Sequence, residues 1–288
     1  MEFPGLHIEP AQGAHTHTAI LLHGRGSNGP EFAEELFSSA TSSNKNLANT
    51  LPNWRWVFPT SRERWDSRFQ EELSAWFEAY SLTDIQERQE LQVDGLRESV
   101  AYILDVLENE IHLLDGKTSH VYLGGMSQGM ATALWTLFCA TGRVRGQLGG
   151  FLGFCGWLPF AHQLEDLLGQ PDKVESPSRR PKGTRIQSLM SRLLPDSIGK
   201  PEVSQRNESG DTFLLSTPVF LSHGTDDAWV SVQLGRQAAR ILRQISVEVE
   251  WDEFDGAEND GHWVKEPEGF DKMVGFLERT MQERSGRG

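Results

Sequence analysis

The chain has 288 residues, and 27 basic against 41 acidic side chains give it a formal net charge of −14 at pH 7. This acidic balance argues against a nucleic-acid partner, because phosphate binding relies on a net basic surface. Cys139 and Cys155 are the only cysteines, which excludes a disulfide framework and argues against a cysteine-based zinc site.

Short apolar runs alternate with helical stretches along most of the chain. The runs predict strands at 18–22, 54–58, 120–123, 149–155, 218–222 and 247–254. The stretches between and after them predict helices at 30–42, 85–114, 128–141, 230–245 and 267–283. This order predicts the α/β class, with a mostly parallel central sheet covered by helices on both faces.

Residues 171–211 depart from this alternation. They are rich in Pro, Ser and Gly and hold eight basic and six acidic side chains. So long a connection without secondary structure is uncommon in a compact domain. It is either a partly disordered surface excursion or a lid near the site, with a short helix at 186–194. We expect a single domain over 1–288 with this insertion and a frayed polar tail after Met281.

The sequence GMSQG at 125–129 is the only G-x-S-x-G pattern in the chain. A predicted strand precedes it and a predicted helix follows it, which is the context of a nucleophile elbow. In such an elbow, small residues on both sides of the serine let the strand and the helix approach closely. The pattern predicts Ser127 as a nucleophile. The alternative is an ordinary serine in a glycine-rich turn.

A serine nucleophile needs a base, and on this fold the chain order is Ser, then Asp or Glu, then His. Three histidines follow Ser127: His162, His223 and His262. The first precedes the irregular segment, and His223 ends a predicted strand with no later loop for the acid. His262 follows the last predicted strand, so we expect it to be the base rather than a solvated loop residue.

The acid should follow the fifth predicted strand, where Asp226 and Asp227 are adjacent. Spacing alone does not separate these two. Asp260 shares the loop of the predicted base and is expected to face solvent.

Two backbone amides should stabilise the negative charge that develops on the substrate oxygen. One is the amide of Gln128, directly after the serine. The other lies in the turn at 24–26, where glycines let the backbone point inward. A phosphate-binding loop fits poorly, since neither a G-K-S/T nor a helix-opening G-x-G-x-x-G is present. No metal or organic cofactor is expected, since the sequence has no H-E-x-x-H or carboxylate–histidine cluster.

Several motifs together resemble acyl-protein thioesterases, which belong to the phospholipase/carboxylesterase group of α/β-hydrolases. The ordered motifs are LLHGRG at 21–26, WF at 76–77, GGMSQG at 124–129, GWLP at 156–159, HGTDD at 223–227 and GH at 261–262. The resemblance implies an α/β-hydrolase fold with Ser127 as nucleophile, Asp227 as acid and His262 as base. It also implies the amides of Arg25 and Gln128 as the oxyanion hole.

An apolar pocket for the substrate is also expected. Its candidate side chains are aromatic or aliphatic, namely Trp76, Phe77, Trp157, Leu158, Trp229 and Trp263. Trp229 and Trp263 stand where smaller side chains are usual in the family, which makes a short, bulky or aromatic acyl group as plausible as a long chain. Arg25 either meets an anionic group of the substrate or is solvated.

These features predict a serine hydrolase that cleaves carboxylic esters or thioesters through an acyl-enzyme. The substrate is an acylated protein or a small molecule. The alternatives are an esterase or acyltransferase of a small-molecule pathway and, less favoured, a ligand-binding homologue without catalysis. The sequence leaves the oligomeric state open.

The N-terminal residues lack the basic start and apolar core of a signal peptide. The chain also has no run of about 18 apolar residues that would span a membrane. No cysteine that lipid could modify lies near the N-terminus. We therefore expect a soluble, cytoplasmic protein without a stable membrane anchor.

Overall fold

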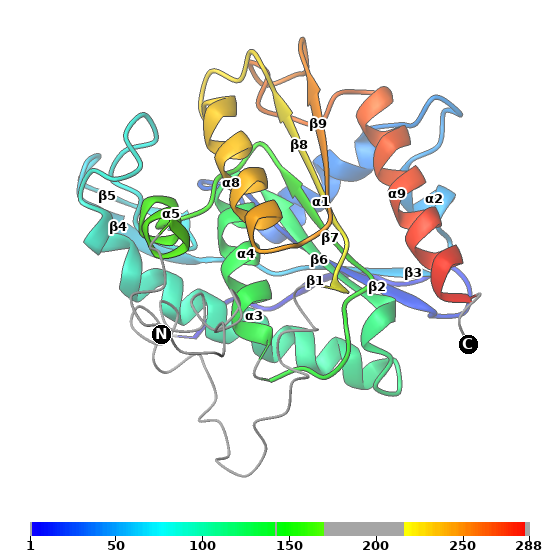
Figure 1. Ribbon diagram of the computed structural model, residues 1–288. Coiled ribbons are helices and arrows are strands. Elements are labelled where there is room, and N and C mark those ends of the chain that lie inside the picture. Colours follow the sequence, from blue (N-terminus) through cyan, green and yellow to red (C-terminus); the bar gives the residue numbers. More distant parts are fainter. Residues whose placement is uncertain (1, 142, 170–215, 286–288) are drawn as a thin grey trace.

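A seven-stranded sheet forms the centre of the protein in a computed structural model that describes residues 2–141, 143–169 and 216–285 (Figure 1). The strand order is β1-β3-β2-β6-β7-β8-β9. Every neighbouring pair is parallel except β1 and β3. The strands are β1 (His7–Glu9), β2 (His17–Leu22), β3 (Trp54–Phe58), β6 (Val121–Met126), β7 (Gly150–Phe154), β8 (Val219–Gly224) and β9 (Val249–Phe254).

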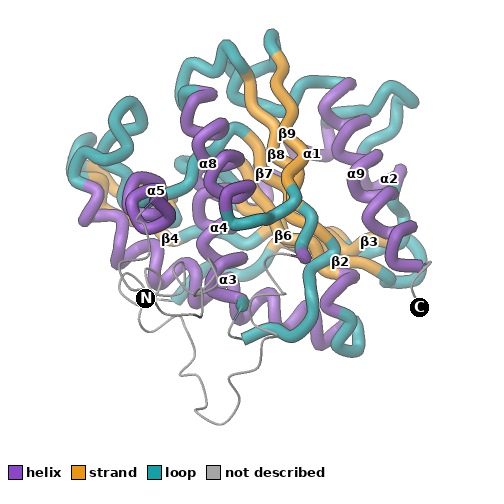
Figure 2. Tube along the Cα trace, in the orientation of Figure 1, coloured by secondary structure: helices purple, strands orange, loops and turns teal. Residues whose placement is uncertain are grey.

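Helices cover both faces of this sheet, as Figure 2 shows around the orange strands. Residues of α3, α4, α5 and α8 pack into one apolar core, and those of α1, α2 and α9 pack into the other. The helices are α1 (Gly29–Ser38), α2 (Leu47–Thr50), α3 (Gln92–Leu113), α4 (Gln128–Ala140), α5 (Ala161–Gly169), α8 (Val232–Gln244) and α9 (Glu268–Ser285), with 3₁₀ turns η1 (Gln89–Leu91) and η2 (Thr118–His120).

The central strands send successive side chains into opposite cores. In β2, Ile20 and Leu22 enter the core under α3 and α4, whereas Ala19 and Leu21 enter the core under α1 and α9. This alternation follows from the two-residue repeat of a strand. A strand that is buried on both faces therefore reads as an uninterrupted apolar run. The expected α/β-hydrolase architecture, a mostly parallel sheet between two helical layers, is confirmed.

The helix expected at 85–114 is shorter in the structure and begins only at Gln92. Arg88 has a φ of 52°, a left-handed conformation that interrupts a helix. The side chain of Gln92 donates to the carbonyl of Ile85 and so closes the preceding turn. The apolar spacing found the buried face of α3 but did not show where the backbone turns.

Further elements were not expected from the sequence. They are the edge strand β1, the helices α2 and α5, the short turn η2 and a separate antiparallel hairpin of β4 (Arg62–Asp66) and β5 (Glu71–Ala75). The hairpin is polar, so its strands lack the apolar signal of the central sheet. The insertion at 171–211, with its expected helix at 186–194, lies outside the described residues. The tail expected to fray after Met281 continues α9 as far as Ser285.

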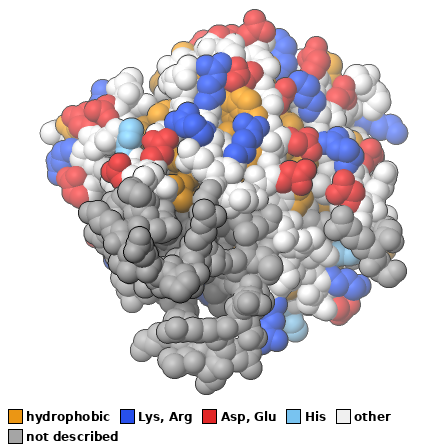
Figure 3. Space-filling model, in the orientation of Figure 1, with side chains coloured by type: hydrophobic (Ala, Val, Ile, Leu, Met, Phe, Trp, Pro, Cys, Tyr) orange, Lys and Arg blue, Asp and Glu red, His pale blue; other side chains and the backbone are white. Residues whose placement is uncertain are grey.

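Charged side chains of both signs are interspersed on the face shown in Figure 3. Over α8, Arg236 pairs with Glu253 and Arg240 pairs with Glu165. Near α9, Arg279 pairs with Glu250. Exposed pairs of this kind contribute little to stability. None of the described helices is long and apolar enough to cross a membrane.

The start of α4 crosses β2 at very close range. A Cβ atom on Gly125 would lie 2.6 Å from the carbonyl carbon of Gly129 and 2.7 Å from the oxygen of Leu22. A Cβ atom on Gly129 would collide with the backbone oxygens of Leu22 and His23. Glycine is therefore required at both positions, because backbone atoms cannot yield as a flexible side chain can.

We predict that Gly129→Ala lowers the free energy of unfolding by about 1–3 kcal/mol, since the added methyl group forces α4 away from β2. Urea denaturation measures this change. Gly5→Ala is the matched control, because a Cβ atom there would meet nothing within 4 Å. Equal midpoints for the two variants would contradict the proposed crowding.

Candidate functional site

Ser127 occupies a strained turn between β6 and α4. Its φ of 55° and ψ of −120° lie outside the usual regions for a residue with a side chain. Its amide donates to the carbonyl of Phe154 in the neighbouring strand β7, at 2.8 Å. Strand, strained serine and helix follow one another as a nucleophile elbow requires. The serine is 7% exposed.

The chain segments after β8 and β9 are joined to each other. The amide of Thr225 donates to the carbonyl of Phe254 at 2.7 Å, and the amide of Ala228 donates to the carbonyl of Asp260 at 3.1 Å. The carboxylate of Asp226 accepts from the amide of Gly256 at 2.8 Å. These bonds between the two loops bring Asp227, which follows β8, beside His262, which follows β9.

His262 and Asp227 form a direct hydrogen bond, with 2.7 Å between Nδ1 and Oδ2. The other carboxylate oxygen, Oδ1, accepts from the amides of Trp229 and Val230, each at 2.9 Å. Burial acts to raise the pKa of Asp227, but hydrogen bonds from His223 and His262 outweigh it and hold the pKa well below its usual range. The carboxylate is therefore ionised and oriented toward the imidazole.

Two further side chains surround the same carboxylate. Nε2 of His223 lies 2.9 Å from the carbonyl of Val230 and 3.2 Å from Oδ2 of Asp227. The thiol of Cys155 is also close, so that Cys155, Asp227 and His262 each present a ligand atom within 4.8 Å of the others. Burial raises the pKa of the Cys155 thiol, which opposes the thiolate form that a metal needs. Moreover, Asp227 and His262 bond to each other directly, so the atoms that a metal would need are already engaged in a hydrogen bond.

The amide of Gln128 occupies the first turn of α4, where intrahelical acceptors are missing. The side chain of Gln128 is buried and makes two bonds to a neighbouring segment. Oε1 accepts from the amide of Trp76 at 2.9 Å, and Nε2 donates to the carbonyl of Phe77 at 2.8 Å. The indole of Trp76 in turn donates to the carbonyl of His23 at 2.8 Å. These bonds hold the turn after β2 next to the start of α4.

The guanidinium of Arg25 extends away from that turn toward the β4–β5 hairpin. Nη1 donates to Oδ2 of Asp66 at 3.3 Å and to the carbonyl of Ala79 at 3.1 Å. Its Cζ atom lies 5.5 Å from the ring centre of Phe69. The side chain is therefore engaged within the protein rather than solvated, and it fastens the turn at 24–26 to the hairpin.

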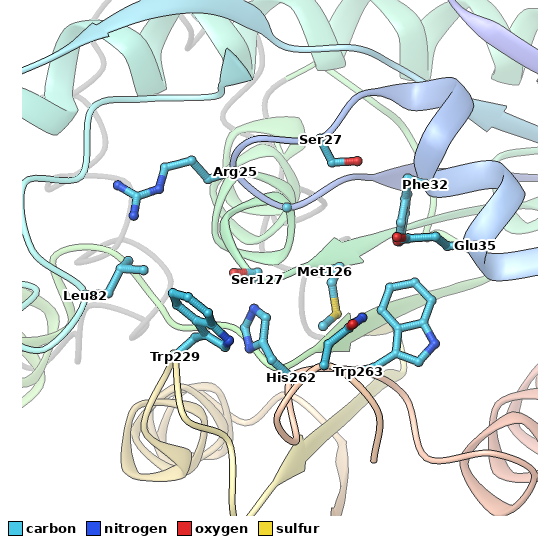
Figure 4. Close-up of a pocket in the computed structure, with 12 residues that line it drawn as sticks. Arg25, Ser27, Phe32, Glu35, Leu82, Met126, Ser127, Trp229, His262 and Trp263 are labelled. Atoms are coloured by element: carbon cyan, nitrogen blue, oxygen red, sulfur yellow. The ribbon is translucent and has the colours of Figure 1, made fainter. Parts of the chain in front are cut away.

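A cavity of about 420 Å³ opens in front of Ser127 and His262. Figure 4 shows both side chains at its centre, with Arg25, Leu82 and Trp229 on one side and Phe32, Glu35 and Trp263 on the other. The lining residues are Gly24, Arg25, Ser27, Phe32, Glu35, Leu82, Met126, Ser127, Trp229, Asn259, His262 and Trp263. The cavity joins the elbow, the turn after β2 and the loops after β8 and β9.

Only two of the side chains expected to line the pocket do so in this cavity. Trp229 is 58% exposed at its rim, and Trp263 lies on its wall. The other four, Trp76, Phe77, Trp157 and Leu158, are buried in the core under α3 and α4 and are absent from the lining. The expectation is corrected for these four. Trp76 and Phe77 support the cavity indirectly, through the side chain of Gln128.

Other lining residues were not singled out from the sequence. Phe32 and Glu35 are three residues apart on α1, so they lie on one face of the helix. Ser27 follows the glycine turn, and Met126 sits inside the G-x-S-x-G pattern. For Ser27 and Met126, the available signal in the sequence was their position next to the glycine turn and within the G-x-S-x-G pattern. Phe32 and Glu35 carry no sequence signal, because only the packing of α1 brings them to the cavity.

Comparisons with known proteins agree with this architecture. The chain is 24% identical to acyl-protein thioesterase 1 of Yarrowia lipolytica over 257 residues, which cover 88% of each chain. It is also 24% identical to acyl-protein thioesterase 1 of Gibberella zeae over 283 residues, or 96% of each chain. The crystal structure of Zea mays acyl-protein thioesterase 2 superposes with a TM-score of 0.67 at 22% identity, covering 96% of this chain and 99% of that one.

A model of the phospholipase/carboxylesterase family matches residues 4–174. The matched part includes β2 with its glycine turn, the segment at 76–77 and the elbow of Ser127. Asp227 and His262 lie beyond it. The match extends over more than half of the 288 residues, so the chain belongs to the phospholipase/carboxylesterase family.

Proposed function

We propose that the protein hydrolyses carboxylic esters or thioesters through an acyl-enzyme on Ser127. The observation that carries the proposal is one cavity lined by a strained serine and by a histidine bonded to a buried carboxylate. These are the three groups that nucleophilic acyl transfer needs, in the chain order that α/β-hydrolases use. Family membership supports the same class of reaction.

In the first half of the reaction, Nε2 of His262 removes the proton of the Ser127 hydroxyl as Oγ attacks the acyl carbon. Asp227 holds the imidazole through Nδ1 and stabilises the cation that forms. The amides of Arg25 and Gln128 donate to the oxyanion. The bond to the leaving group then breaks, and the imidazolium gives its proton to the departing alkoxide or thiolate.

In the second half, water replaces the leaving group. His262 removes a proton from the water as its oxygen attacks the acyl-enzyme, and the same proton returns to Oγ as the acid is released. The chemistry requires no metal or organic cofactor. Acylated proteins are substrate candidates because similar proteins bear the name acyl-protein thioesterase. A cytoplasmic location remains a prediction from the sequence.

We predict that Ser127→Ala lowers the rate of 4-nitrophenyl butyrate hydrolysis by at least about 10³-fold, since the acyl-enzyme cannot form. Labelling by a fluorophosphonate probe should also disappear. Ser43→Ala is the matched control, because this serine is exposed on the loop after α1. Undiminished labelling of the Ser127 variant would refute the assignment.

The two adjacent aspartates should differ in their effects. Asp227→Asn should lower kcat by about 10²- to 10⁴-fold, because the amide no longer stabilises the imidazolium. Asp226→Asn keeps an oxygen that accepts from the amide of Gly256, so its rate should fall by less than about tenfold. The comparison uses steady-state kinetics with the same ester. A larger loss in the Asp226 variant would identify the other aspartate as the acid.

Trp229→Ala should weaken the preference for bulky acyl groups. The exposed indole lines the cavity, and burying about 50 Å² of it against a substrate is worth roughly 1 kcal/mol, or about fivefold. The ratio of kcat/KM for a phenylacetyl ester to that for an acetyl ester should fall by about this factor. Trp65→Ala is the control, since that tryptophan is 55% exposed but does not line the cavity. An equal fall in both variants would contradict a specific contact.

A further inference from the structure

The cavity around Ser127 has charged side chains on two opposite sides. Arg25 stands at the side of Leu82 and Trp229, and Glu35 stands at the side of Phe32 and Trp263 (Figure 4). A substrate that spans the serine therefore meets a different charge at each end. The two charges differ in whether other groups of the protein are already paired with them.

The charge of Arg25 is balanced within the protein. Its guanidinium bonds to Asp66, which is 3% exposed, and to the carbonyl of Ala79. Arg68 lies near enough to repel it, but Glu78 accepts from the amide of Ser67 in the same hairpin. The charge of Arg25 is thus already paired with the buried carboxylate of Asp66. Arg25 therefore has little charge left for an anionic substrate.

The charge of Glu35 is not balanced in this way. Within the part of the chain that the structure describes, its carboxylate makes no ion pair and no side-chain hydrogen bond. Its neighbours on α1 include Glu31 and Glu34. Burial raises the pKa of Glu35 most, and repulsion by these two carboxylates raises it further. Since Glu35 has no paired cation among the described residues and two more carboxylates lie beside it on α1, this end of the cavity has an excess of acidic groups, in a chain whose net charge is already −14.

Aromatic rings stand beside this carboxylate. Phe32 and Trp263 both line the cavity and pack edge to face, with 6.1 Å between their ring centres. The face of an aromatic ring attracts cations, and an ammonium group is stabilised further by a carboxylate. The chemistry of this wall thus suits a positively charged group and disfavours a carboxylate or phosphate.

We propose that Glu35 makes the enzyme selective for esters or thioesters that carry a cationic group, such as a substituted ammonium. This inference rests on the proposed hydrolase function and specifies its substrate class. For a charge pair that remains partly solvated, the expected preference over a neutral isostere is about three- to tenfold in kcat/KM. An anionic analogue should be the poorest of the three.

The test uses thioesters with cationic, neutral and anionic ends of similar size. One series varies the thiol: S-butyrylthiocholine, its tert-butyl carbon isostere and S-butyryl-3-mercaptopropionate. A second series carries trimethylammonium, tert-butyl or carboxylate at the end of the acyl chain on a common thiol. Thiol release measures kcat/KM. We expect the cationic preference in at least one series, and its absence from both would overturn the proposal.

Variants of α1 locate the cause of the preference. Glu35→Gln should bring the cation-to-neutral ratio close to one, and Glu35→Lys should bring it below one. Glu34→Gln is the matched control, because it removes the same charge from the preceding residue of α1, which does not line the cavity. An equal loss in the control would show a general effect of net charge and would also overturn the proposal.

A binding measurement separates this inference from the proposed function. Calorimetry with Ser127→Ala compares the thiocholine ester with its carbon isostere without turnover. Tighter binding of the cation, lost in Ser127→Ala/Glu35→Gln, would support the charge selection even if no ester were hydrolysed. Hydrolysis of neutral esters without any charge preference would leave the proposed function standing and refute only the role of Glu35.

Discussion

The geometry of the site depends on the strained backbone at Ser127, which the protein can hold only because β2, β6 and α4 approach so closely. The left-handed φ of this serine is costly, and the surrounding structure must impose it. Gly125 and Gly129 permit the required contact with β2. The amide bond from Ser127 to Phe154 then fixes the turn against the next strand. The hydroxyl is therefore presented at the carboxyl end of the sheet, where the loops of four strands converge.

Much of this arrangement was predictable from the sequence, for identifiable reasons. Strands buried on both faces read as apolar runs, so β2, β3, β6, β7 and β8 were predicted to within a few residues, as was the edge strand β9. The G-x-S-x-G pattern indicated the elbow because strand and helix signals flank it. Spacing could not separate Asp226 from Asp227, since the distinction lies in which carboxylate turns inward. In the structure Asp227 bonds to His262, and Asp226 bonds to the backbone of Gly256.

The walls of the cavity were much harder to predict. Nine tryptophans are spread along the chain, and apolar character alone does not distinguish a core side chain from a pocket side chain. Trp76 and Trp157 are buried, whereas Trp229 is exposed beside Ser127. Glu35 reads as an ordinary exposed residue of an amphipathic helix. Its position at the cavity follows from the way α1 packs, which no local pattern contains.

The hydrogen bonds of the buried Gln128 side chain have a consequence for how enzymes of this architecture could diversify. Through Trp76 and Phe77 it ties the residue after Ser127 to the segment at the end of the β4–β5 hairpin, while Arg25 bonds to Asp66 in the same hairpin. The hairpin is thus held at the end of β5 by the segment that Gln128 binds, and at Asp66 and the tip residue Phe69 by Arg25. Changes in length or composition at that tip would reposition Arg25 and so reshape one side of the cavity, while the bonds of Gln128 keep the turn at Ser127 in place.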